Sequence, residues 1–105
     1  MNNIVVVYKF SLNQGISTEQ FIKASKKIDA LIVDMSGFLY RSVTQIDADN
    51  WLTIAYWESQ SALDKSQYIV ENLDFTAFMG MINVETISKI VADVHTSVMP
   101  EMKAA

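Results

Sequence analysis

Cysteine is absent from this chain of 105 residues. A disulfide framework, a thiolate metal site and a cysteine nucleophile are therefore excluded. Only three glycines occur, and neither the G-x-x-x-x-G-K phosphate loop nor the G-x-S-x-G nucleophile elbow is present. The sequence thus lacks the signatures of P-loop nucleotide binding and of α/β-hydrolase catalysis.

Basic residues are in the minority, because 8 lysines and arginines face 12 aspartates and glutamates and leave a net charge of −4. An acidic chain repels a phosphate backbone, so we expect no nucleic-acid partner. Long apolar runs are also missing. The run from Ile4 to Tyr8 is far too short to span a bilayer, and the first three residues lack the basic start of a signal peptide. We therefore expect no membrane partner and a cytoplasmic location.

Apolar residues are abundant, since 50% of the chain is hydrophobic and only 19% is charged. One continuous series of periodic segments predicts a single domain over residues 1–105. The apolar share is above that of an ordinary soluble chain of this size, which indicates buried subunit surface.

Periodicity predicts four strands and three helices. Strands are predicted at residues 4–10, 38–46, 51–57 and 87–98. Ser17 and Gln20 form a capping-box pattern that begins the first helix, and Gly37 is placed to stop it. Further helices are predicted at residues 62–70, after a cap at Ser59 or Ser61, and at residues 75–82, after an Asp74 cap, with a linker at residues 83–86.

The hairpin within residues 37–59 carries large apolar side chains on both faces. Strict alternation puts Phe38, Tyr40, Trp51, Ala55 and Trp57 on one face, and Leu39, Val43, Leu52, Ile54 and Tyr56 on the other. Each face therefore needs a cover.

The element order predicts an α+β fold of the ferredoxin-like, split βαβ type (β-α-β-β-α-β), with a four-stranded antiparallel sheet. Right-handed crossovers place both helical segments on one face. The other face would expose a large apolar area. We expect a second copy of the chain to cover it in a symmetric homodimer, sheet against sheet.

A series of residues in and after the hairpin carries a family resemblance: Gly37-Phe38-Leu39, Trp51, Tyr56-Trp57-Glu58-Ser59, Ala62-Leu63, Phe75, Phe78, Met79 and Met81-Ile82. In these the chain resembles the antibiotic biosynthesis monooxygenase-like family of dimeric α/β barrel proteins. The resemblance implies a homodimeric barrel and, in members that are enzymes, a pocket between sheet and helices for a flat or apolar small molecule. Some members oxygenate polycyclic aromatic substrates without metal or flavin, others degrade haem, and others isomerise or bind small metabolites.

The haem-degrading members carry an asparagine in the first strand, a tryptophan in the second helix and a histidine in the third. A rough alignment, anchored on Gly15 and on Trp57-Glu58-Ser59, puts these positions near Tyr8, Ser66 and Met79. None of the three matches. Haem degradation is therefore not expected, and we expect no cofactor.

Candidate catalytic residues are His95 and Tyr8. His95 is the only histidine, and histidine is the residue type that suits proton transfer near neutrality. Tyr8 brings a phenol to a strand, where it can donate to a developing oxyanion. The alternatives are a structural or interface role for His95, and for Tyr8 a phenol that only forms a hydrogen bond with the backbone. No second histidine stands at ligand spacing, so no metal site is expected.

Candidate ligand-binding residues are the large side chains that can stack on a planar molecule, although the same side chains can simply form core: Tyr40, Tyr56, Trp57, Phe75, Phe78 and Met79. Arg41 is expected to form a cross-strand or interface ion pair with an acidic residue of the neighbouring turn or strand, namely Asp47, Asp49 or Glu58, and the less favoured alternative is a clamp for an anion.

Two functions are compatible with these patterns. The first is a cofactor-independent monooxygenase that acts on, or binds, a small apolar or aromatic metabolite between sheet and helices. The alternative is a noncatalytic small-molecule-binding or structural homodimer.

Overall fold

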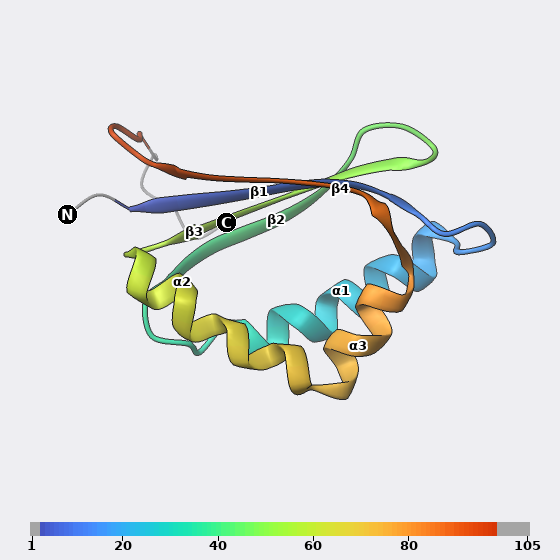
Figure 1. Ribbon diagram of the computed structural model, residues 1–105, viewed down its shortest axis with the longest axis horizontal. Coiled ribbons are helices and arrows are strands. Elements are labelled where there is room, and N and C mark those ends of the chain that lie inside the picture. The colour runs from blue at the N-terminus through green and yellow to red at the C-terminus, as the bar shows by residue number, and fades with distance from the viewer. Residues whose placement is uncertain (1–2, 99–105) are drawn as a thin grey trace, which may run out of the picture.

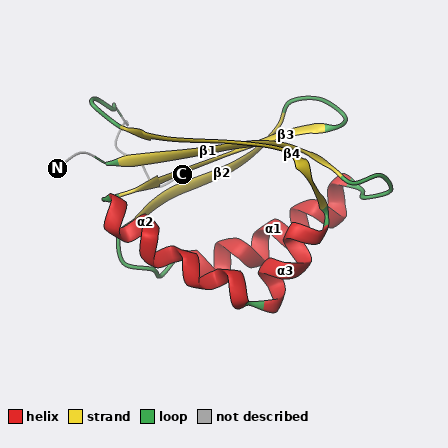
Figure 2. Cartoon of the chain, in the orientation of Figure 1, coloured by secondary structure: helices red, strands yellow, loops and turns green. Residues whose placement is uncertain are grey.

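The computed structural model describes residues 3–98, which form a sheet packed against one layer of helices (Figure 1, Figure 2). The elements are β1 (Ile4–Leu12), α1 (Thr18–Ile32), β2 (Phe38–Gln45), β3 (Asn50–Trp57), α2 (Gln60–Ser66), the 3₁₀ helix η1 (Gln67–Glu71), α3 (Leu73–Gly80) and β4 (Ile82–Asp93). The predicted α+β class and split βαβ order are confirmed. Among the described residues, no helix is long and apolar enough to cross a membrane.

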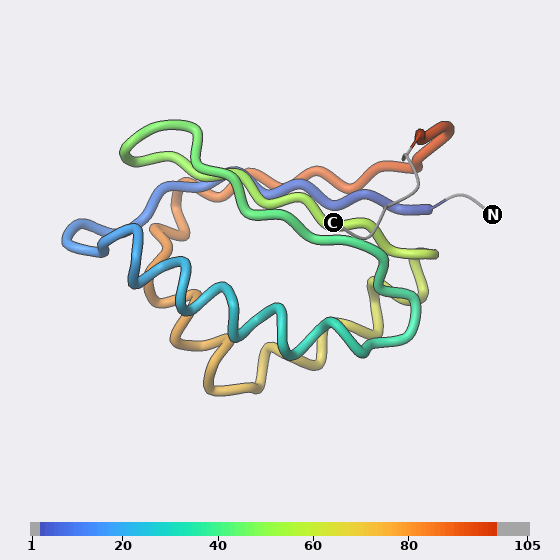
Figure 3. Tube along the Cα trace, turned by 180° about the vertical axis from the view of Figure 1, so that it is seen from behind, coloured from blue at the N-terminus to red at the C-terminus, as the bar shows by residue number. Residues whose placement is uncertain are grey.

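The sheet has the strand order β2-β3-β1-β4, and every neighbouring pair is antiparallel. The view from behind shows the helices on one side of the sheet only (Figure 3). The other side carries no helix of the described chain, as the crossover rule predicts.

Helix α1 begins with the predicted capping box. The Ser17 hydroxyl accepts a hydrogen bond from the Gln20 backbone N–H at 3.1 Å, and the Gln20 side-chain oxygen accepts one from the Ser17 N–H at 2.8 Å. The buried stripe of α1 then follows at helical spacing: Phe21, Ala24, Ser25, Ile28 and Ile32. Gly37 lies in the turn before β2 with a φ of +84°, a backbone conformation that favours glycine.

A bulge at the start of β2 changes which side chains share a face. Phe38 pairs with Trp57 and Tyr40 pairs with Tyr56, so Leu39 is an extra residue. Directly paired residues share a face of the sheet. The prediction that Tyr40 lies on the face of Phe38 and Trp57 is therefore wrong, because strict alternation assumes an unbulged strand.

The second helical segment is more broken than predicted. Helix α2 begins earlier, at Gln60, because the Ser59 hydroxyl accepts from the Ala62 N–H at 3.1 Å. It gives way to η1 after Ser66. The cap of α3 is Asn72, not Asp74, since the Asn72 side chain accepts from the Asp74 N–H at 2.8 Å.

Strand β4 is displaced toward the N-terminus relative to the prediction. The stretch predicted as a linker at residues 83–86 belongs to the strand, where Asn83 pairs with Ser11 before a shift of register. The strand ends at Asp93 because β1, its one neighbour among the described strands, begins at Ile4, the ladder partner of Asp93. His95 therefore lies beyond the strand, and it is exposed.

Two groups of buried residues fill the space between sheet and helices. The first centres on Phe21, whose ring centroid lies 4.8 Å from that of Trp51 and 5.2 Å from that of Phe78. The second contains Ile4, Val6, Ile32, Trp57 and Leu63. Both groups combine residues of the sheet with residues of the helices, so the inner face of the sheet is the core face.

Candidate functional site

A cavity of about 200 Å³ lies between the sheet and the helices. Its wall includes members of both core groups and is mainly apolar, with Val6, Ala55 and Trp57 from the sheet and Ile28, Phe75 and Phe78 from the helices. Apolar walls with a few polar groups are typical of small-molecule sites.

Five side chains supply the hydroxyl, amide and guanidinium groups of the wall: Tyr8, Arg41, Thr53, Ser66 and Gln67. Tyr8 and Thr53 are paired across β1 and β3, so their hydroxyl-bearing side chains rise from neighbouring positions on the inner face. The Ser66 hydroxyl already donates to the Leu63 carbonyl at 2.6 Å. Among the described residues, no aspartate or glutamate lines the cavity.

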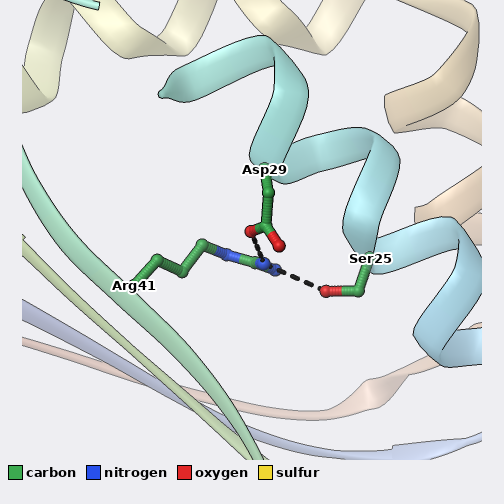
Figure 4. A network of polar contacts seen from close by, with 3 residues as sticks. All are labelled: Ser25, Asp29 and Arg41. Carbon is green, nitrogen blue, oxygen red and sulfur yellow. Dashed lines mark hydrogen bonds and ion pairs between the residues drawn. The ribbon is translucent and has the colours of Figure 1, made fainter. Parts of the chain in front are cut away.

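Arg41 reaches from β2 across to α1, where Ser25 and Asp29 lie one turn apart (Figure 4). Its Nη1 atom donates to the Asp29 carboxylate at 2.6 Å and to the Ser25 hydroxyl at 3.0 Å. The Arg41 side chain is 9% exposed and that of Asp29 is 52% exposed. The guanidinium carbon also lies 5.9 Å from the ring centroid of Phe78, within the range of a cation–π contact.

The predicted partners of Arg41, namely Asp47, Asp49 and Glu58, are therefore wrong. The bulge at Leu39 brings Arg41 opposite Ala55, onto the inner face of the sheet. From that face the side chain meets α1 and the cavity instead of the turn or the strand end. Sequence reasoning missed its place in the cavity for this reason.

The sequence-predicted site residues fall into two sets. Tyr8, Trp57, Phe75, Phe78 and Met79 all line the cavity.

The remaining three do not line the cavity. Tyr40 and Tyr56 face each other on the outer side of the sheet, with ring centroids 6.0 Å apart and planes nearly perpendicular. His95 is exposed beyond the end of β4.

Sequence reasoning did not single out Thr53 and Gln67 as cavity residues. For Thr53 a signal was available, since it shares a face of β3 with Trp51, Ala55 and Trp57 by alternation. For Gln67 none was available, because the change from α2 to η1 sets its direction.

Three positions compared with the haem-degrading proteins, Tyr8, Ser66 and Met79, all lie on the cavity wall. The mismatch at these positions is thus a mismatch within the cavity. Among the described residues, no group of three or more histidine, cysteine, aspartate or glutamate side chains is placed to hold a metal ion.

The element order, the antiparallel sheet and the one-sided helical layer define the ferredoxin-like α+β fold. No protein-family model and no curated protein matches this chain. Proteins of known structure do match it. They include antibiotic biosynthesis monooxygenase-like proteins, so the resemblance predicted from the sequence is confirmed at the level of the fold.

The matching structures include SnoaB, a cofactor-independent oxygenase from Streptomyces nogalater, with a TM-score of 0.76 at 15% identity over 96% of this chain and 100% of that chain. A monooxygenase from the gene ActVA-Orf6 of Streptomyces coelicolor, in complex with Nanaomycin D, gives 0.71 at 15% identity over 95% and 94%. A dimeric ferredoxin-like protein from an uncultured marine organism gives 0.72 at 10% identity over 96% and 95%. At these identities the similarity establishes the fold.

Proposed function

We propose that the protein is a cofactor-independent monooxygenase that takes a small apolar or aromatic metabolite into the cavity between sheet and helices. The observation that carries the proposal is the mainly apolar cavity with the Tyr8 phenol in its wall. The similarity in fold to SnoaB and to the ActVA-Orf6 protein, both described as oxygenases, supports it.

Such a reaction asks little of the protein, because an electron-rich substrate itself reduces oxygen. At an anthrone-type CH₂ group, one oxygen atom of O₂ becomes the new carbonyl oxygen, and the other leaves as water with the two hydrogens. The protein must exclude bulk water and stabilise the oxyanion that develops on the substrate. We assign the donor role to Tyr8, because its side chain lines the cavity.

The ligand contacts in this proposal come from Trp57, Phe75, Phe78 and Met79, which line the cavity and can pack on the faces and edges of a flat ring. His95 stays a prediction from the sequence, and the proposal does not depend on it.

We further propose a homodimer formed through the outer face of the sheet. That face carries Val5, Val7, Leu52, Ile54, Tyr56 and Ile90, and Ile90 is 58% exposed in the single chain. A second copy would bury these side chains symmetrically. The dimeric description of the marine ferredoxin-like protein supports this arrangement. The cytoplasmic location stays a prediction from composition.

Oxygen uptake tests the catalytic proposal. We expect the purified protein, without added metal or flavin, to consume oxygen with at least one of a panel of hydroquinones and anthrones of one to three rings. Tyr8→Phe should lower the rate about 100-fold, the usual cost of losing one oxyanion donor. Tyr68→Phe is the matched control, because Tyr68 is 69% exposed and does not line the cavity. A panel that gives no rate above buffer, or a Tyr8→Phe variant with full rate, would contradict the proposal.

A noncatalytic binding protein is the second candidate. The Ser66 hydroxyl favours it, because this polar group of the cavity wall already donates its hydrogen bond to the Leu63 carbonyl within the same helical segment. This candidate predicts that aromatic molecules from the same panel bind in the cavity while oxygen uptake stays at the level of buffer.

A further inference from the structure

Arg41 is the only arginine in the chain, and its side chain is 9% exposed and lines the cavity. Arginine is rarely so buried without a partner, because removing its charge from water is costly. A nearly buried guanidinium that lines an apolar cavity is therefore a feature that a ligand can use.

The hydrogen bonds of Arg41 leave part of the guanidinium unused. Both bonds, to Asp29 and to Ser25, come from Nη1. A guanidinium has five N–H donors in a planar fork, so the N–H groups of Nε and Nη2 have no hydrogen-bond partner among the described residues. The edge formed by Nε and Nη2 matches the two oxygens of a carboxylate.

The charges around the cavity favour an anion. No carboxylate of the described chain lines the cavity, and Asp29, which is 52% exposed, meets Arg41 from helix α1. On the opposite edge of the sheet, the Lys89 ammonium lies 5.6 Å from the ring centroid of Tyr8. Arg41 is thus the one charged side chain among the described residues that line the cavity.

The guanidinium is also held in orientation. It lies over the ring of Phe78, which is stacked on Phe21 with centroids 5.2 Å apart. Asp29 and Ser25 fix its Nη1 end on α1. A planar ligand can therefore pack against the apolar wall while an acidic group at its edge meets a preorganised donor pair.

We infer that the cavity takes a flat apolar molecule that carries one carboxylate, and that Arg41 is the residue that selects for the carboxylate. This inference rests on the cavity of the proposed function but does not require that the protein be an oxygenase. It makes charge, as well as flatness, a criterion for the substrate.

A pair of probes with the same shape and different charge tests the inference. The cavity, at about 200 Å³, is below the roughly 300–1,000 Å³ of sites for drug-sized ligands, so two fused rings suit it. We choose 2-naphthoate, an anion at neutral pH, and 2-naphthamide, its neutral counterpart. Titration calorimetry should show that naphthoate binds about 10- to 100-fold more tightly, the usual worth of hydrogen bonds to a charged group.

Nuclear magnetic resonance locates the contact directly. Since Arg41 is the only arginine, the labelled protein gives a single arginine Nε–H signal. Naphthoate should shift this signal strongly, and naphthamide should shift it little.

Substitutions test whether the preference for naphthoate comes from Arg41 or from other positive charge near the cavity. Arg41→Met should remove the preference, so that naphthoate and naphthamide bind with equal affinity. Arg41→Lys, which keeps the charge but lacks the planar fork, should retain part of the preference. Lys89→Met is the control, because it removes an exposed cation near Tyr8 that does not line the cavity, and it should change the affinity for naphthoate by less than about fivefold.

The outcomes distinguish this inference from the proposed function. If both probes bind equally in the cavity, or if Lys89→Met and not Arg41→Met removes the preference, the inference is wrong while an aromatic-binding cavity stands. If neither probe binds at millimolar concentration, the aromatic-binding cavity fails and the inference fails with it.

Discussion

Arg41 of β2 and Asp29 of α1 are joined by a hydrogen-bonded ion pair of 2.6 Å, in which the arginine is almost buried and the aspartate is half exposed. The pair connects the hairpin to the first helix across the edge of the core. Because the buried partner is the cation, loss of the carboxylate leaves a charge with little access to water.

Asp29→Asn should therefore lower the free energy of unfolding by about 1–2 kcal/mol. This is less than the loss seen for fully buried pairs, because water still reaches Asp29. Urea unfolding followed by circular dichroism measures the change. Asp34→Asn is the control, since Asp34 is exposed just after α1, and it should change stability by less than about 0.5 kcal/mol. Equal losses in the two variants would show that the ion pair adds nothing.

Periodicity predicted the order of the strands and helices, but it did not predict which side chains of β2 lie on which face of the sheet. The capping box at Ser17 and the hairpin strands are local patterns, and they were confirmed. The bulge at Leu39 is set by how β2 meets β3 and leaves no signal in alternation. One extra residue was enough to exchange Tyr40 and Arg41 between the outer face and the core face.

Glycine at position 37 is required by two independent features. Its φ is +84°, and a Cβ built at this position would lie 2.5 Å from the Cβ of Ala62 on α2. Gly37→Ala should therefore cost about 2–4 kcal/mol, from backbone strain together with overpacking. Gly15→Ala is the matched control, because Gly15 has a φ of +89° and no atom within 4 Å of its built Cβ, so it should cost only about 1–2 kcal/mol.

Thermal or urea unfolding of the two glycine variants distinguishes the cost of backbone strain, which both variants share, from the cost of the contact with Ala62, which only Gly37→Ala has. If Gly37→Ala were no less stable than Gly15→Ala, the close approach of α2 to the turn would not matter. The double variant Gly37→Ala with Ala62→Gly should recover part of the loss, because it removes the clashing methyl group.

The apolar residues of the cavity were among the predicted site residues, and the catalytic role of His95 stays a prediction. Trp57, Phe75, Phe78 and Met79 were candidates because they are large and apolar, and the same property places them on the inner side of the fold. His95 was a candidate because it is the only histidine, and residue type alone carries no information about position. A residue type with suitable chemistry predicts a site only when the register of its strand is known.

The free energy of unfolding should depend on pH through Asp47, which lies in the turn between β2 and β3. Hydrogen bonds from the Asn50 side chain and from the backbone N–H groups of Asp49 and Asn50 lower the pKa of the Asp47 carboxyl below its ordinary value. When a carboxyl has a lower pKa in the folded protein than in the unfolded chain, it stabilises the fold at pH values above its pKa in the unfolded chain. This stabilisation disappears as the pH falls through the pKa of the folded protein.

Nuclear magnetic resonance titration of the Asp47 carboxyl measures this pKa directly. In unfolding experiments, Asp47→Ala should be less stable than the unchanged protein at neutral pH, and the difference should shrink as the solution becomes more acidic. A difference that stays constant down to low pH would show that the charge of the carboxylate is not the cause.

The proposed dimer makes Ile54 a sensitive position. Ile54 lies on the outer face of the sheet, paired with Val7 of β1 and Ser42 of β2, near the centre of the surface that a second copy would cover. Ile54→Lys should leave the chain folded, because the side chain does not face the core. It should disrupt the dimer, because it buries a charge between two apolar sheets.

Val33→Lys, at a position that is 57% exposed after α1, is the control and should keep the dimer. Sedimentation at micromolar concentration should find twice 11.8 kDa for the unchanged protein and for Val33→Lys, and 11.8 kDa for Ile54→Lys. A mass of 11.8 kDa for the unchanged protein would overturn the proposed dimer.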